Sequence, residues 1–187
     1  MSGLGYKLAR LLIALLISFN SHSLTLEDYL PKDTKYDSSV PTPKAVTGIE
    51  VGQRHYRHDQ IIQYLSVLAA SSNRAKIVEY GQTNEGRRLV LLFISSEVNM
   101  IKFERLHENK ELLKVWNGFS VHGDEASGAN ASVLYAYHLA AGHSEEINKL
   151  LEETLIIIDP TINPDGYDRF VNDVNSMRGI IDNTDVN

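Results

Sequence analysis

The strongest constraint on the fold is a pair of nearly continuous apolar runs at residues 88–95 (RLVLLFIS) and 154–158 (TLIII). Runs of this length without polar alternation are typical of strands that are covered on both faces. Residues 58–71 space their apolar side chains with helical periodicity and predict an amphipathic helix. A buried sheet needs helices to cover it, so these segments together indicate an α/β fold.

Further strands and helices alternate along the chain. We expect strands at 76–80 and 114–121, and helices at 100–113, 127–141 and 144–153. A short polar turn separates the first of these strands from the apolar run that follows it, which predicts a hairpin at a sheet edge. The predicted architecture is a mixed central sheet flanked by helices.

The N-terminus has the pattern of a signal peptide at residues 1–23. Lys7 and Arg10 precede an apolar run at 11–19, and cleavage after Ser23 fits the small residues there. The run is too short to cross a bilayer as a helix. We therefore expect a secreted or periplasmic protein without a stable membrane anchor after cleavage, and a buried N-terminal helix is the alternative.

Composition excludes several kinds of chemistry. The chain has no cysteine, which rules out disulfides, thiol nucleophiles and cysteine zinc sites. The formal net charge is -6 and no long basic run occurs, so we expect no nucleic-acid partner. Residues 24–48 contain three prolines and predict an extended N-terminal arm packed on the domain surface.

A candidate metal site follows the strand predicted at 114–121. His122 and Glu125 stand three residues apart there, and Gly123 lets the backbone turn sharply between them. An imidazole nitrogen and a carboxylate oxygen both suit Zn²⁺. The spacing alone is a weak signal and favours a solvated turn over a metal site, so both interpretations stay open at this point.

Three segments taken together resemble the M14 family of zinc carboxypeptidases, in particular its secreted bacterial members. They are residues 79–96 (EYGQTNEGRRLVLLFISS), 120–128 (SVHGDEASG) and 159–179 (DPTINPDGYDRFVNDVNSMRG). The likeness extends over about residues 27–179. It implies a zinc-carboxypeptidase-like fold, in which residues 49–187 form the N-terminal portion of a catalytic domain truncated at its C-terminus.

The resemblance implies one Zn²⁺ held by two His and one Glu, with water in the open position. His122 and Glu125 match the first two ligands. Arg178 matches an arginine beside the zinc, which would contact the substrate and stabilise the developing oxyanion. We interpret Arg169 as structural, and the Asn-Pro-Asp-Gly sequence at 163–166 as a structural turn, because Pro fixes φ and Gly permits positive φ.

The remaining family requirements find no match: a second His ligand, a Glu general base and an Asn-Arg pair for the terminal carboxylate. Only nine residues follow Arg178, and no His occurs after His143. Two ligands should hold zinc weakly, and a sheet without its remaining strands has an exposed edge. We therefore expect this chain alone to be inactive and poorly stable.

The leading hypothesis is a zinc-dependent metallocarboxypeptidase, a hydrolase that removes C-terminal residues from peptides. The alternatives are a related zinc hydrolase or amidase acting on cell-wall peptides, and a non-catalytic peptide-binding pseudoenzyme. A serine hydrolase is disfavoured because no serine has a convincing His and Asp constellation. No role is predicted for the histidines in polar surroundings or in the apolar helix, which are His55, His58, His107, His138 and His143.

Overall fold

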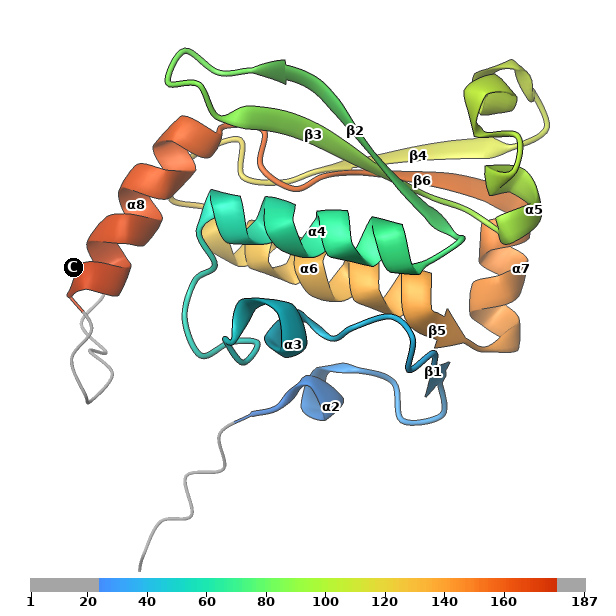
Figure 1. The fold of residues 1–187 in the computed structure, drawn as a ribbon, viewed down its shortest axis with the longest axis horizontal. Helices are drawn as coiled ribbons and strands as arrows, with labels where there is room; N and C mark the ends of the chain where they lie inside the picture. The colour runs from blue at the N-terminus through green and yellow to red at the C-terminus, as the bar shows by residue number, and fades with distance from the viewer. Residues whose placement is uncertain (1–23, 178–187) are drawn as a thin grey trace, which may run out of the picture.

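The computed structural model describes residues 24–177, so the predicted signal peptide at 1–23 lies outside the described residues. A four-stranded sheet lies over two long helices, α4 (His58–Ser71) and α6 (Ala126–Ala141), which run side by side beneath it (Figure 1). The bounds of α4 are those that its periodicity predicts. The described part of the chain is an α/β fold, as expected.

The sheet is mixed. Its order is β2-β3-β6-β4, formed by β2 (Ala75–Gln82), β3 (Arg88–Ile94), β6 (Thr154–Asp159) and β4 (Leu113–Gly118). β3 is antiparallel to both β2 and β6, whereas β4 is parallel to β6. The predicted β2–β3 hairpin lies at one edge. Because β4 and β6 are parallel, their carboxyl ends lie at the same end of the sheet, and the segments that leave both strands start there.

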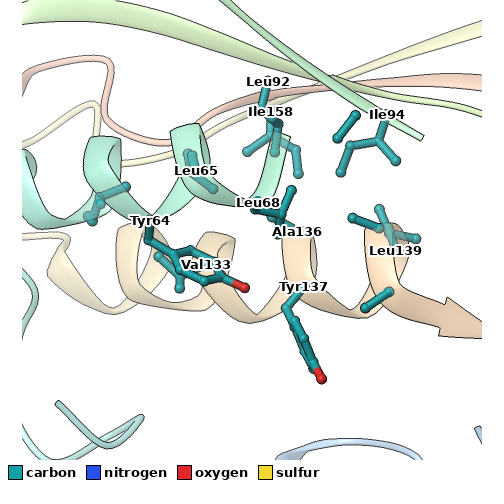
Figure 2. Packing of buried hydrophobic residues seen from close by; sticks show 14 of the residues in the cluster. Tyr64, Leu65, Leu68, Leu92, Ile94, Val133, Ala136, Tyr137, Leu139 and Ile158 are labelled. Atoms are coloured by element: carbon teal, nitrogen blue, oxygen red, sulfur yellow. The ribbon is translucent and has the colours of Figure 1, made fainter. Parts of the chain in front are cut away.

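The core lies between the sheet and the two long helices. Figure 2 shows Leu92 and Ile158 of the sheet beside Leu65 and Leu68 of α4 and Ala136 of α6, and each of these five is fully buried. Burying one leucine side chain contributes about 1.5–3 kcal/mol. This packing fixes where β6, and hence the segment after it, can lie.

The helix predicted at 100–113 is wrong. The structure has a short helix α5 (Glu97–Met100), a 3-10 helix η1 (Phe103–Glu108) and then the start of β4. Among the side chains described at 100–113, Leu106 and Leu112 are buried against Leu155 of β6, and Met100 and Phe103 pack partly buried beside them. Residues 107–111 are all polar or charged, so a helix continued through them would have no apolar side chain to bury, and most helical stability comes from such burial.

The N-terminal segment 24–48 lies across the face of the two long helices that is turned away from the sheet (Figure 1). Tyr36 stacks on Tyr137 of α6 with ring centroids 5.3 Å apart, and its hydroxyl lies 2.7 Å from Nδ1 of His138. The elements involved are α2 (Leu26–Tyr29), β1 (Lys35–Tyr36), α3 (Pro43–Thr47) and β5 (Gly142–His143), the last of which pairs with β1.

Two further helices complete the described residues. α7 (Glu145–Glu153) precedes β6, and α8 (Pro164–Ser176) follows it. None of the helices between residues 24 and 177 has the length and apolar character needed to cross a bilayer.

Candidate metal centre

The segments that leave β4 and β6 are joined by backbone hydrogen bonds. The Phe119 amide donates to the Asp159 carbonyl (3.0 Å), and the Ile162 amide donates to the Phe119 carbonyl (2.9 Å). The Asn163 amide donates to the carbonyl of Ser120 (3.1 Å). The loop that carries His122 is therefore held against the loop that enters α8.

His122 and Glu125 are in direct contact on the exposed surface of this loop. Nδ1 of His122 lies 3.1 Å from Oε1 of Glu125, and the His122 backbone amide donates to Oε2 at 3.0 Å. The hydrogen bond to Glu125 raises the pKa of His122, and bonds from His122 lower the pKa of Glu125. The two side chains converge, which is the geometry that the metal-site hypothesis requires.

The donor types fit a zinc ion, but only in part. Imidazole nitrogen and carboxylate oxygen are both zinc ligands, and these two already approach one point. A protein zinc site needs at least three such ligands. Residues 24–177 contain no group of three or more His, Cys, Asp or Glu side chains placed to hold a metal. His122 and Glu125 could thus contribute part of a coordination shell.

Of the two arginines considered from the sequence, Arg178 and Arg169, the structure describes only Arg169. Arg178 lies outside the described residues, directly after the last described residue of the chain. Arg169 pairs with Glu85 at the tip of the β2–β3 hairpin, and 70% of its side chain remains exposed. It therefore links two elements and does not approach His122 through any contact that the structure gives.

The sequence at 163–166 is the start of a helix rather than a free-standing turn. Asn163 is the N-cap of α8, and its Oδ1 accepts from the Gly166 amide at 3.1 Å. Pro164 occupies the first helical position, where its missing amide costs nothing. Gly166 does not have a positive φ, so the expected reason for this glycine is wrong.

The structure contains a charged cluster beside α8 that the sequence analysis does not predict. Arg87, at the base of the hairpin turn, donates to Asp165 (2.7 Å) and Asp168 (2.8 Å), both on α8. Thr83 adds a bond to Asp165 at 2.8 Å. The available signal was the i, i+3 spacing of the two aspartates, which puts them on one helix face.

His58, which is expected in polar surroundings, is buried instead. It is 4% exposed and makes two ring contacts, with the hydroxyl of Thr161 at Nδ1 (2.7 Å) and the carbonyl of Arg88 at Nε2 (2.8 Å). Because a carbonyl only accepts, Nε2 carries the proton and Nδ1 accepts from Thr161. Burial lowers the pKa of His58. This histidine ties α4 to β3 and to the segment after β6.

Asp159 is a second buried ionisable group near the candidate centre. It ends β6, is 4% exposed and accepts from the Tyr80 hydroxyl at 3.1 Å. Burial raises the pKa of its carboxyl group. Two surface hollows, of about 310 Å³ beside α4 and α8 and about 680 Å³ at α5 and η1, are lined by neither His122 nor Glu125.

The fold and the donor pair define an α/β domain whose candidate site lies beyond the carboxyl ends of two parallel strands. Residues 61–183 match the family described as zinc carboxypeptidase, Peptidase M14. The chain belongs to this family, as its motifs predict.

The chain is similar to carboxypeptidase D of Drosophila melanogaster, with 31% identity over 121 residues that cover 62% of this chain and 8% of that protein. It is 29% identical over 119 residues to the human carboxypeptidase N catalytic chain, covering 62% of this chain and 24% of the relative. Among solved structures, carboxypeptidase A from Helicoverpa armigera superposes with a TM-score of 0.52 and 26% identity, over 72% of this chain and 31% of that one. These matches confirm the expected fold class, and the chain spans less than a third of each of these three proteins.

Proposed function

We propose that the protein acts as a zinc-dependent metallocarboxypeptidase, a hydrolase that removes C-terminal residues from peptides. Membership of the family supports the class of activity. The observation that carries the proposal for this chain is the contact between His122 Nδ1 and Glu125 Oε1 at 3.1 Å, beyond the carboxyl end of β4. The proposed substrate is a peptide, and no nucleic-acid partner is proposed.

His122 and Glu125 would supply two of the zinc ligands. A bound zinc would lower the pKa of a water molecule and polarise the scissile carbonyl. Arg178 would hydrogen-bond the oxyanion, since a fixed guanidinium presents donors at the place where charge develops. Among residues 24–177, no third His, Cys, Asp or Glu side chain joins this pair in a group that could hold a metal. The proposed consequence is that the 187-residue chain binds zinc weakly and does not hydrolyse peptides alone.

Zinc binding tests this assignment directly. We expect equilibrium dialysis to show saturable zinc binding by the wild-type chain, and loss of that binding in His122→Ala and Glu125→Ala. The matched control is His143→Ala, which removes another exposed imidazole at the far end of α6. Unchanged zinc binding in both site variants would remove the basis of the proposal.

The alternatives within the same family are an amidase or hydrolase acting on cell-wall peptides, and a non-catalytic peptide-binding protein. A polypeptide that also contains the missing ligands would separate them. A carboxypeptidase should cleave peptides with a free C-terminal carboxylate and leave C-terminally amidated ones intact. Cleavage of cell-wall peptides alone would favour the amidase, and binding without cleavage would favour the pseudoenzyme.

We also propose that residues 1–23 direct export, which would place the protein in the periplasm or outside the cell. The order of basic residues, apolar run and small residues supports this. N-terminal sequencing of the protein from the cell exterior or periplasm should find a chain that starts at Leu24. An intact Met1 on cytoplasmic protein would contradict it.

A further inference from the structure

The loop that carries the donor pair is exposed, which raises the question of what fixes it. The side chains of His122 and Glu125 are 77% and 53% exposed, so packing of these side chains cannot hold them in place. A metal centre needs its donors oriented before the ion arrives. The restraint must therefore come from the backbone of the loop.

The backbone at Gly123 rests directly against the backbone at Gly166. A Cβ atom added at Gly123 would lie 2.3 Å from the carbonyl carbon of Gly166 and 2.4 Å from its oxygen. Atoms of this kind cannot approach so closely, and a backbone in the first turn of a helix cannot rotate away as a side chain can. Only glycine at 123 permits this contact between α8 and the loop at residues 119–125, which carries His122 and Glu125 and is called the donor loop below.

The contact works together with local strain and hydrogen bonding. Ser120 has φ 53°, in the left-handed region that residues other than glycine rarely adopt. Its Oγ donates to the His122 carbonyl at 3.1 Å, and its own carbonyl accepts from Asn163. Such a conformation persists only where surrounding contacts fix it, and here they come from His122 in the same loop and from Asn163, the N-cap of α8.

The first turns of α8 are themselves anchored on another side. Arg87 of the hairpin holds Asp165 and Asp168, whose side chains are 19% and 14% exposed. Asp168 also accepts from the backbone amide of His58 at the start of α4. Contacts with the hairpin and with α4 thus fix the start of α8, and the donor loop packs against it at Gly166.

We infer that Gly123 and the start of α8 at 163–166 are positioning elements for the metal donors His122 and Glu125. The Asn-Pro-Asp-Gly sequence then supports the donor pair through its backbone, without touching the metal or the substrate. This inference rests on the proposed function for the identity of the ligand, zinc. The packing of the donor loop against α8 does not depend on that function.

The experiment compares two positioning variants with two controls in the full chain. Gly123→Ala introduces the backbone clash, and Asn163→Ala removes the cap that orders the first turn of α8 while keeping the loop sequence intact. Val171→Ala is the destabilised control, because Val171 is fully buried on α8 further from the loop. Gly81→Ala is the neutral control, because its added Cβ would meet only Leu89 at an ordinary 3.9 Å.

We expect Gly123→Ala to weaken zinc binding at least about 10-fold, the scale on which supporting residues act on metal affinity. Asn163→Ala should weaken it by a smaller factor. Val171→Ala should lower Tm but keep the zinc affinity of the wild type. If Gly123→Ala and Asn163→Ala, where folded, bind zinc no more weakly than Val171→Ala, the inference is overturned.

Amide hydrogen exchange supplies a readout without zinc. The amides of Ile162 and Asn163 donate to carbonyls of the donor loop, so their protection reports whether the loop is seated. They should exchange faster in Gly123→Ala than in Val171→Ala. If the wild-type chain binds no zinc at all, the proposed function fails, while unchanged exchange of these two amides in Gly123→Ala would overturn the positioning inference separately.

Discussion

At the scale of single residues, the sequence predicts that His122 and Glu125 converge but misjudges residues whose contacts are distant along the chain. His122 and Glu125 are three residues apart, and their contact follows from the loop between them. His58 depends on Thr161 and Arg88, which are 103 and 30 residues away. The sequence suggests that Gly123 is needed for a local turn of the backbone, whereas in the structure a larger residue at 123 would collide with the backbone of Gly166. Periodicity and spacing carry no information about such partners.

His58 leads to a prediction about pH. Burial lowers its pKa in the folded chain below the ordinary value of 6.5, so the unfolded chain binds the extra proton first as the pH falls. Its contribution to stability is therefore complete above pH 6.5 and is lost as the pH falls toward the lowered value. Urea unfolding between about pH 7.5 and 5.5 should show a smaller loss of stability for His58→Gln than for the wild type. An equal loss in both would contradict a neutral, buried imidazole.

At the scale of elements, long periodic segments are predicted well and polar ones are not. The bounds of α4 are those predicted, and each hairpin strand ends within two residues of its predicted bounds; α4 and β3 supply buried apolar side chains of the core. In the segment at 100–113 the polar residues 107–111 interrupt the apolar face, and the residues at 163–166 predict a turn although they start α8. The N-cap Asn163 and the proline at the first helical position are local signals for the start of α8, so the sequence did contain that information.

Arg87 provides the test at this scale, since it joins the hairpin to α8. Its side chain is 25% exposed, and Arg87→Ala would leave Asp165 and Asp168 without their cation. We expect a loss of about 2 kcal/mol in the free energy of unfolding. The control is Arg57→Ala, whose pair with Asp59 is 45% and 66% exposed and should be worth less than about 1 kcal/mol. Similar losses in the two variants, measured by urea unfolding, would argue against an anchoring role for Arg87.

At the scale of the whole molecule, the α/β class and the family follow from the sequence, whereas the metal centre is only partly defined. The two proposed donors, His122 and Glu125, converge, and the described residues offer no third in a group that could hold a metal. The sheet has a related feature. Among the described strands, β4 has a neighbour, β6, on one side only. Alternate amides and carbonyls of β4 therefore face outward, beside Leu113 and Trp116, which are 62% and 60% exposed.

An edge strand is often protected by a lysine, but here Lys114 does not project along the edge. Its Nζ donates to the carbonyls of Asn109 (2.7 Å) and Leu112 (3.3 Å) at the start of β4. We therefore predict that the chain associates with itself through β4, with a mass that rises with concentration in sedimentation equilibrium. Trp116→Lys places a charge in the middle of the edge and should shift the chain toward monomer. Val98→Lys, at a 70% exposed residue of α5 outside the sheet, should not. If both variants reduce association equally, general surface hydrophobicity would explain it better than pairing at β4.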